Sequence, residues 1–373
     1  MQSLDNNTLA FIALVRAGLW ETDVRLRTIG VVNFNVIFRL AQEQSVAGLV
    51  AAGLEHVIDV KVPKEVVLFF VGDTLQIEQR NIAMNHFIRD LIERMRSADI
   101  YTLLVKGQGI AQCYERPMWR ASGDIDLYLS EENFLKARDF LKPHVESFYP
   151  SSLKSRRIEM SYGIWVVELH ANQRISLSAR ANIGLDEIHD DLFHKGNVRC
   201  WNNGGTAVFL PCPDDDVIIV FTHYLNHFYK GGVGLRQICD WCRLLWTYRD
   251  SIDRKRLESR LKSMKLMSEW KAFAAFAVDY LGMAVNAMPF YDSDCKWSKK
   301  AERIMGFIME VGNMGHNRDN SYYGEYPYVI RKAASFRRRV GDLCRHTVIF
   351  PFDSLKFFPY MAFIGLKSAI RGE

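Results

Sequence analysis

The spacing of hydrophobic residues divides the chain into three parts. Up to about residue 97 apolar residues recur at the spacing of amphipathic helices, between about 100 and 211 they form short runs bounded by turn residues, and from Pro213 helical spacing returns. At 373 residues the chain is too long for one small core. We therefore expect a helical N-terminal unit over 1–98, an α/β core over 99–211 and a helical C-terminal domain over 212–373.

The two outer parts are predicted as series of helices. In the N-terminal part the apolar spacing predicts helices over 7–19, 33–55 and 63–97. In the C-terminal part it predicts helices over 213–229, 234–249, 253–264, 266–283, 295–312, 325–340 and 352–369. The stretch Asn313–Tyr323 is rich in Gly, Asn and Tyr, which is typical of a mobile loop.

The middle part is predicted to mix strands with short helices. Short apolar or alternating runs predict strands over 101–105, 124–129, 155–160, 164–170, 197–201 and 206–210. Helices are expected over 110–114 and 131–141, the second beginning after the capping residue Ser130 and ending before Pro143. The expected fold class is α+β.

A pair of carboxylates stands in the centre of this part, in Gly123-Asp124-Ile125-Asp126-Leu127. Side chains alternate along a strand, so Asp124 and Asp126 are expected to point the same way while Ile125 and Leu127 enter the core. Carboxylates held close together call for a cation, and hard oxygen ligands suit Mg²⁺ bound to phosphate. Glu168, on a neighbouring predicted strand with His170, could complete the metal shell or take a proton from a hydroxyl.

A glycine turn precedes these carboxylates. Gly107 to Gly109 follows a predicted strand and precedes a predicted helix, so its N–H groups could hold phosphate oxygens, with Lys106 adding positive charge. The alternative is a tight strand-to-helix turn without a ligand.

Composition narrows the class of ligand and the cellular compartment that we expect for this protein. The net charge of +5 permits an anionic ligand such as a nucleotide but lacks the concentrated basic character of a nucleic-acid binder. Seven scattered cysteines are an odd number, which favours free thiols in a reducing cytoplasm. Asp5 and Arg16 flank and interrupt the first apolar run, so no secretory signal is expected, and no stretch reaches 18 uncharged apolar residues.

Three motifs together resemble a known family. They are Leu104-Val105-Lys106-Gly107, Arg120-x-Ser122-Gly123-Asp124-Ile125-Asp126-Leu127 and Val167-Glu168-Leu169-His170. This set is similar to the polymerase-β-like nucleotidyltransferase superfamily, and most similar to its bacterial, largely uncharacterised nucleotidyltransferase branch. The resemblance covers roughly residues 100 to 250, and it implies a polymerase-β-like core of a small mixed sheet with helices, flanked by the helical units.

The resemblance also implies roles for individual residues. Asp124 and Asp126 would bind two Mg²⁺ ions, with Glu168 holding the second and favouring deprotonation of an acceptor hydroxyl. The residues expected near the nucleoside triphosphate are Lys106, Gly107, Arg120, Ser122 and Gly123. The chain departs from the pattern at Gln108, where serine is usual, and at Glu168, where aspartate is common, and either change could leave a folded but inactive relative.

Further residues are candidates for lining the site. His223 and His227 lie four apart on one helix face, where a packed or substrate-facing pair is favoured over a metal site. Arg236 and Asp240 also lie four apart, and could form an intrahelical ion pair or line the site and position the domains. Cys239 and Cys242 are expected to be buried thiols rather than zinc ligands.

The C-terminal region has two interpretations. A basic cluster is followed by an aromatic, apolar stretch from Phe350 to Ile370. A solvated helix followed by a core helix is favoured, and contact with a membrane surface or a partner is the alternative. The cluster comprises Arg331, Lys332, Arg337, Arg338, Arg339 and Arg345.

The sequence thus predicts a cytoplasmic, Mg²⁺-dependent nucleotidyltransferase. It would move a nucleoside monophosphate from a nucleoside triphosphate to a hydroxyl-bearing acceptor, which could be a small molecule, a sugar or a protein, and release pyrophosphate. The alternative is a catalytically silent nucleotide-binding or partner-binding module that retains the fold.

Overall fold

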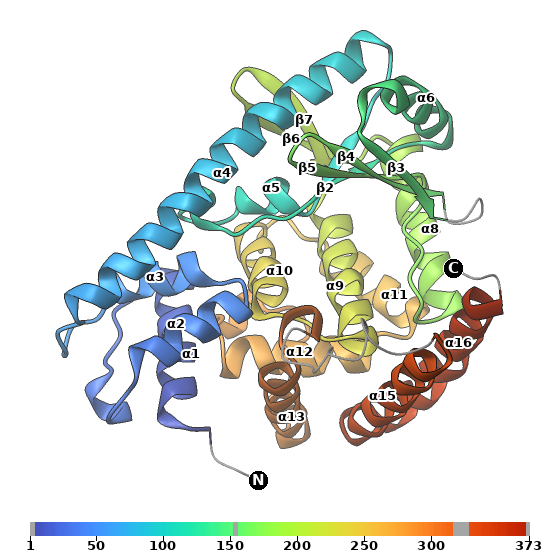
Figure 1. Cartoon of the computed structure of the whole chain (residues 1–373). Coiled ribbons are helices and arrows are strands. Elements are labelled where there is room, and N and C mark those ends of the chain that lie inside the picture. The colour runs from blue at the N-terminus through green and yellow to red at the C-terminus, as the bar shows by residue number, and fades with distance from the viewer. Residues whose placement is uncertain (1–3, 152–155, 316–327, 371–373) are drawn as a thin grey trace.

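The N-terminal part of the computed structural model is helical (Figure 1). The structure describes residues 4–151, 156–315 and 328–370. The first four helices are α1 (Asn6–Trp20), α2 (Phe34–Glu43), α3 (Ala47–Glu55) and α4 (Lys64–Ser97). The predictions for α1 and α4 are confirmed within one residue. The Asp5 carboxylate caps α1 by accepting hydrogen bonds from the N–H groups of Asn7 and Thr8.

The single helix predicted over 33–55 is wrong, because the chain breaks between α2 and α3. Ser45 adopts a positive φ of 56°, which ends helical geometry there. At this break the chain contacts a segment far away in the sequence. The Gln44 side chain is buried, and its oxygen accepts a hydrogen bond from the N–H of Leu235 at 3.0 Å. A contact across 191 positions cannot be read from local hydrophobic spacing.

The middle of the chain forms a five-stranded mixed sheet and a separate hairpin. The sheet order is β1-β2-β5-β4-β3, with β2 and β5 parallel and all other neighbours antiparallel. Its strands are β1 (Leu103–Val105), β2 (Ile125–Tyr128), β3 (Ser147–Ser151), β4 (Arg157–Tyr162) and β5 (Trp165–His170). The hairpin strands are β6 (Val198–Asn203) and β7 (Thr206–Pro211).

Two elements of this part are absent from the sequence prediction. Strand β3 pairs only with β4, and an edge strand can include a proline and lack apolar alternation. Helix α8 (Ala179–His194) begins after the capping residue Ser178 and buries Leu185, Ile188 and Leu192 at helical spacing, so its signal is present in the sequence. Helix α5 (Gly107–Ala111) begins three residues earlier than predicted, and α6 (Glu131–Leu141) is confirmed.

The C-terminal part returns to helices, as predicted. They are α9 (Pro213–Lys230), α10 (Leu235–Thr247), α11 (Arg254–Met264), α12 (Met267–Asp279), α13 (Cys295–Val311), α15 (Tyr328–Ile349) and α16 (Pro351–Ile370). Helix α15 continues nine residues beyond the predicted end at 340. Of the predicted mobile loop, Asn313–Gly315 forms a short 3₁₀ turn, and the remainder lies outside the described residues.

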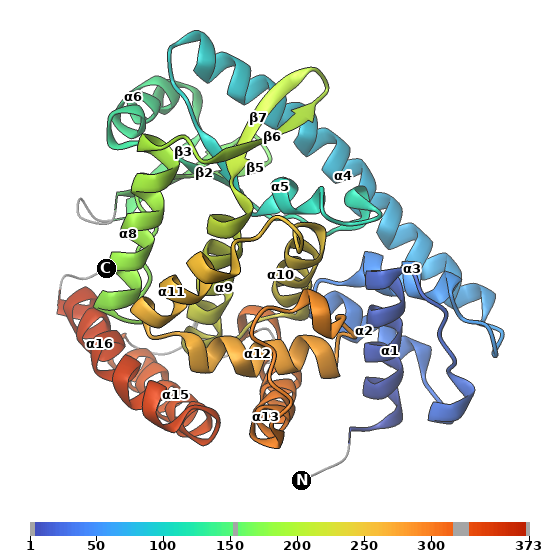
Figure 2. The same cartoon turned by 180° about the vertical axis from the view of Figure 1, so that it is seen from behind.

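Two hydrophobic cores hold these elements together. The larger joins the N-terminal helices to α9, α10, α12 and α13 around buried aromatic rings such as Trp241 and Trp270. The smaller lies between the sheet, α4 and α6. Figures 1 and 2 show α9 and α10 below the sheet and α4 running diagonally along one side of it. The domain boundaries at 98/99 and 211/212 remain predictions.

The C-terminal helices contribute to the larger core. Phe350 just before α16 and Phe357 about two turns later are fully buried, and both rings lie near Tyr229 of α9. Phe352, Leu355 and Phe363 of the same helix are more than 60% exposed, so the core-helix interpretation holds for one side of α16 only. Among the described residues, no helix combines the length and the hydrophobicity needed to cross a membrane.

Candidate active site

The site is built on the only parallel strand pair described in the sheet. In this pair Asp126 of β2 lies opposite Glu168 of β5, and Tyr128 lies opposite His170. Because side chains alternate along a strand, Asp126, Glu168 and His170 share one face of the sheet. Asp126 and Glu168 are 3 and 7% exposed. The sequence prediction that a neighbouring strand brings Glu168 to Asp126 is therefore met by the strand register.

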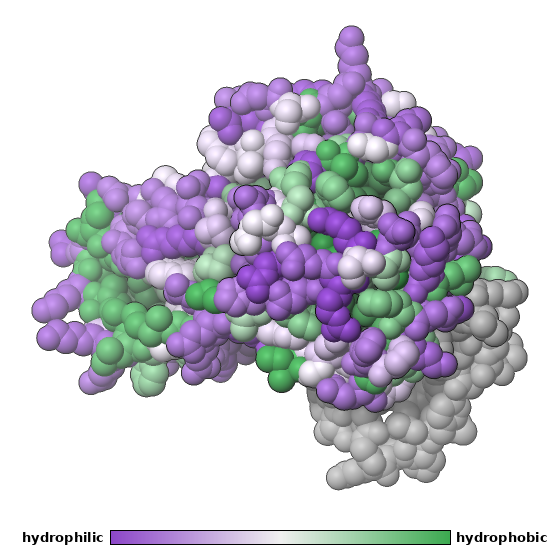
Figure 3. Space-filling model, turned by 90° about the horizontal axis from the view of Figure 1, so that it is seen from above, coloured by the Kyte–Doolittle hydropathy of each residue, from purple (hydrophilic) through white to green (hydrophobic). Residues whose placement is uncertain are grey.

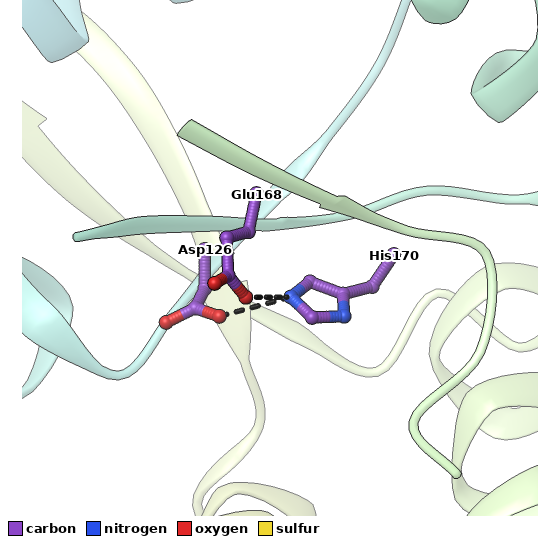
Figure 4. Close-up of side chains that lie close together, drawn as sticks. All are labelled: Asp126, Glu168 and His170. Atoms are coloured by element: carbon purple, nitrogen blue, oxygen red, sulfur yellow. Dashed lines mark hydrogen bonds and ion pairs between the residues drawn. The ribbon is translucent and has the colours of Figure 1, made fainter. Parts of the chain in front are cut away.

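His170 links the two carboxylates. Its Nε2 lies 2.9 Å from Asp126 Oδ1 and 3.2 Å from Glu168 Oε2, and Figure 4 shows the three side chains pointing toward one another. Glu168 also forms an ion pair with Arg157 of β4. The ligand atoms of Asp126, Glu168 and His170 all lie within 4.8 Å of one another, which is close enough to share a metal ion.

Lys106 is the second cation at Asp126. Its Nζ lies 2.8 Å from Asp126 Oδ1, the same oxygen that His170 contacts, and 3.5 Å from His223 Nδ1. The Lys106 backbone has a positive φ of 58° with ψ of −147°, a conformation that non-glycine residues rarely adopt. Gly107 follows with φ +42°. This backbone geometry turns the Lys106 side chain at the end of β1 toward Asp126.

The charges of the site shift its pKa values in opposite directions. Burial alone would raise the pKa of Asp126, but Lys106 and His170 lower it well below its ordinary value. Burial also opposes the lowered pKa of Glu168, for which the hydrogen bond from His170 is the main cause. Burial would lower the pKa of His170, but its hydrogen bonds to the two carboxylates raise it. The site thus favours two ionised carboxylates around a protonated imidazole.

Asp124 differs from Asp126 in its surroundings. It lies just before β2, is exposed to solvent, and has no ion pair among the described residues. The negative charge of Asp126 raises the pKa of Asp124. The two side chains line the same pocket, as the strand alternation predicts. Asp124 is thus an accessible carboxylate whose charge nothing nearby fully compensates.

A buried ion pair fixes the loop that leads to these carboxylates. Arg120 donates from Nε and Nη2 to the two Asp240 oxygens at 2.6 and 2.7 Å, and Tyr114 donates its hydroxyl proton to Asp240 at 2.8 Å. Asp240 raises the pKa of Arg120 although burial opposes it. Ser122 accepts a hydrogen bond from Arg120 at 2.9 Å and does not line the pocket. Ser122 therefore orients Arg120.

The intrahelical ion pair considered for Arg236 and Asp240 does not form, because Asp240 is taken by Arg120. Arg236 instead donates to the carbonyl oxygen of Ala121 at 2.8 Å. Its Nε is buried without a hydrogen-bond partner, and Arg236 has no carboxylate partner among the described residues. Burial and the nearby Arg120 charge lower the pKa of Arg236. The positively charged side chain of Arg236 is thus not paired with a carboxylate among the described residues.

The two histidines of α9 occupy different positions. His223 lines the pocket beside Lys106, whereas His227 packs edge-to-face against His223 with ring centroids 4.6 Å apart. Burial and the charge of Lys106 lower the pKa of His223 well below its ordinary value. Burial is the main cause that lowers the pKa of His227 to about 4. The two rings pack against each other, which is one of the two arrangements expected from the sequence, and a substrate-facing role remains a prediction.

Gln108 has a structural role that the sequence did not predict. It is 1% exposed and donates from Nε2 to Asn81 Oδ1 of α4 at 2.7 Å. Asn81 in turn donates to the carbonyl oxygens of Met118 and Arg120 at 2.8 and 2.7 Å. Gln108 therefore supports the loop before β2 and does not face the pocket, where a serine hydroxyl was expected. A polar residue at helical spacing on the buried face of α4 was the available signal.

Carboxylates and cations meet around one pocket of about 50 Å³ between the sheet, α9 and α10. Gly107 and Gly123 provide part of its wall as bare backbone. The charged and ionisable lining residues are Lys106, Arg120, Asp124, Asp126, His223, Arg236 and Asp240. Glu168 and His170 do not line the pocket and lie beside Asp126.

The donor set fits a divalent cation. Oxygen ligands suit hard ions such as Mg²⁺, and Asp124 and Asp126 present carboxylates to one space. The raised pKa of Asp124 shows that a further positive charge would stabilise the pair of carboxylates. The ligand atoms of Asp126, Glu168 and His170 lie close enough together to hold such an ion, and Asp124 lines the adjoining pocket.

Comparison with known proteins agrees with this chemistry. The chain has no significant match among curated proteins or among solved structures. A family model described as uncharacterised nucleotidyltransferase matches residues 31–282, which extends beyond the motif region on both sides. The match covers the N-terminal helices from α2, the whole sheet and the helices of the pocket. The chain therefore belongs to this uncharacterised nucleotidyltransferase family, and the protein is a transferase enzyme.

Proposed function

We propose that the protein is an Mg²⁺-dependent enzyme with a polymerase-β-like core that transfers a nucleoside monophosphate from a nucleoside triphosphate to a hydroxyl-bearing acceptor. The observation that carries the proposal is that carboxylates and cations line one pocket, and that one of these cations, Arg236, has no carboxylate partner among the described residues. Asp124 and Asp126 form one side, and Lys106 and Arg236 lie among the other lining residues. A phosphate chain bound through a metal needs both kinds of charge.

The cations are placed to bind phosphate oxygens. Arg236 has a buried Nε without a partner and no carboxylate among the described residues, so a phosphate oxygen would supply its missing acceptor. Lys106 can exchange its contact with Asp126 for a phosphate once another cation neutralises that carboxylate. Arg120 already donates to Asp240 from Nε and Nη2 and to Ser122 from Nη1, and its role is to hold the loop that carries Asp124.

The reaction joins the acceptor oxygen to the α-phosphorus while the bond from that phosphorus to the β-phosphate oxygen breaks. Pyrophosphate leaves with the electron pair of the broken bond, and the acceptor loses its hydroxyl proton. A bound divalent cation would supply charge stabilisation on the phosphoryl oxygens. Glu168 would draw the acceptor proton, and His170 and Arg157 hold its carboxylate in place.

The pocket also limits where the nucleoside can lie. A volume of about 50 Å³ holds an ion or a phosphoryl group but not a nucleotide. The base and sugar would lie outside the described pocket. The proposal therefore assigns the pocket to phosphate and metal and leaves the identity of the base to experiment.

The test is incubation of the purified protein with each α-labelled nucleoside triphosphate, Mg²⁺ and cell extract. We expect a labelled product with one or more triphosphates, and its loss in Asp126→Asn and on addition of EDTA. Exposed Asp139→Asn in α6 is a matched control, because its carboxylate lies on the surface and, within the described part of the chain, forms an ion pair with Arg138 alone. No labelled product, together with no triphosphate binding by calorimetry, would refute the proposal.

One observation favours the alternative of a silent binding module. Lys106 and His170 both contact the same oxygen of Asp126, so the protein neutralises this carboxylate without a metal. A cellular effect that survives Asp124→Ala with Asp126→Ala would favour that alternative. Loss of the effect, with triphosphate binding and folding retained, would favour the enzyme.

A further inference from the structure

The N-terminal half of α4 carries an apolar face that the fold leaves uncovered. Figure 3 shows hydrophobic surface at the left, over the end of the molecule where α4 begins. Six apolar side chains of this helix are between 40 and 69% exposed. They are Val67, Leu68, Phe69, Val71, Leu75 and Ile82.

This face is distinct from the side of α4 that packs in the core. Val66, Phe70 and Thr74 are buried and lie on the opposite side of the same turns. Leu68, Leu75 and Ile82 recur at seven-residue intervals, which is the spacing of a helix that packs along another helix. Within the chain, the Phe69 ring still lies near the Phe38 ring, with centroids 6.1 Å apart, and the exposed parts of the six side chains are available to a partner.

Gly72 lies in the middle of the apolar face. A glycine inside an exposed helix costs about 1 kcal/mol relative to alanine. The fold does not require it here, since a Cβ at this position would have no atom within 4 Å. A bare backbone on a helix surface allows a second helix to approach closely.

We propose that this face of α4 is a homodimer interface, in which α4 packs antiparallel on α4 of a second copy about a two-fold axis near Gly72. Leu68 and Leu75 lie at nearly equal distances on either side of Gly72. An antiparallel arrangement therefore places Leu68 of one copy on Leu75 of the other, and the face is complementary to itself.

The exposed area matches what a stable dimer needs. The exposed fractions of the six side chains correspond to about three whole side chains, on the order of 500 Å² of apolar surface. A standard interface buries about 800 Å² on each partner, of which roughly 60% is apolar. The α4 face supplies that apolar share without help from other elements.

Sedimentation equilibrium of the full chain tests the proposal. Concentrations of roughly 1–100 µM cover the range that separates weak from stable dimers. We expect a mass of twice the 43.1 kDa of one chain. Leu68→Glu with Leu75→Glu should give a monomer with an unchanged circular dichroism spectrum. Ile183→Glu is the matched control, because Ile183 is 58% exposed in α8, which lies away from α4 (Figure 1), and this change should leave the dimer intact.

Gly72→Leu separates association from folding. Leucine favours the helix more than glycine does, so the thermal stability of the monomer should not fall, while the dimer dissociation constant should rise at least about tenfold. A wild-type monomer at the highest concentration, or a dimer that survives the double glutamate variant, would overturn the proposal. Flotation of a monomeric wild-type protein with liposomes would also overturn it and would assign the face to a lipid surface.

Discussion

Removing one partner of the ion pair between Arg120 and Asp240 should destabilise this protein strongly. Both side chains are about 5% exposed, and they are joined by two hydrogen bonds of 2.6 and 2.7 Å. Asp240→Asn keeps the shape but removes the negative charge, which leaves a buried guanidinium without a counterion. Removing one partner of a buried ion pair costs about 3–5 kcal/mol. The side-chain carbonyl of the introduced asparagine can still accept a hydrogen bond from Arg120. We therefore expect the loss of unfolding free energy to lie near the lower end of this range, at about 3 kcal/mol.

Urea denaturation followed by tryptophan fluorescence measures this loss. The buried Trp241 is the residue next to Asp240, so the probe reports on the same region. With a urea dependence of about 2 kcal/mol per molar, a loss of about 3 kcal/mol moves the midpoint down by roughly 1.5 M. Replacing both partners, with Arg120→Met and Asp240→Leu, should recover much of the loss, since neither charge then remains buried.

A surface ion pair is the matched control. Glu310 and Arg345 also form a close carboxylate–guanidinium pair, but their side chains are about half exposed. Glu310→Gln should cost less than about 1 kcal/mol. If Asp240→Asn lost no more than this control, water would reach Arg120 in solution, and the assignment of Asp240 as the residue that holds the loop before β2 would be refuted.

Three further predictions follow from the same structure. Gln108→Ala should lower the unfolding free energy by about 1–3 kcal/mol, because Asn81 loses its buried donor, while triphosphate binding by calorimetry stays within twofold; a large loss of binding would place Gln108 at the ligand. Lys106→Met should tighten Mn²⁺ binding to the nucleotide-free protein by about tenfold or more, because a cation 2.8 Å from Asp126 is removed. Weaker Mn²⁺ binding in this variant would show that Lys106 supports the metal. A thiol reagent should label the native protein rapidly at the exposed cysteines and reach Cys239 and Cys242 only after unfolding, since burial raises the pKa of both thiols. Rapid labelling of all thiols in the native state would contradict this; the exposed cysteines are Cys200, Cys295 and Cys344.

Local sequence determined most of the secondary structure and the identity of the acidic site. Hydrophobic spacing predicted the outer helices, because an amphipathic helix must repeat its apolar residues every three or four positions. The alternation in Asp124-Ile125-Asp126-Leu127 predicted two carboxylates on one side of a strand, and the structure places both along one pocket. Glu168 and His170 were found by the same reasoning, because residues two apart in a strand share a face.

Tertiary structure decided which charges meet. Arg120 and Asp240 are 120 positions apart, so the four-residue spacing to Arg236 was the pairing visible in the sequence, although the folded chain pairs Asp240 with Arg120. Gln108 likewise forms its side-chain hydrogen bond with Asn81 of α4. The Gln44 side chain, at the end of α2, accepts a hydrogen bond from the first residue of α10. Contacts of this kind depend on how helices pack around a sheet, and packing depends on the shapes of all neighbours at once. The sequence therefore identified the carboxylates that line the pocket, whereas the fold alone determined which cations pair with carboxylates and that Arg236 has no carboxylate partner among the described residues.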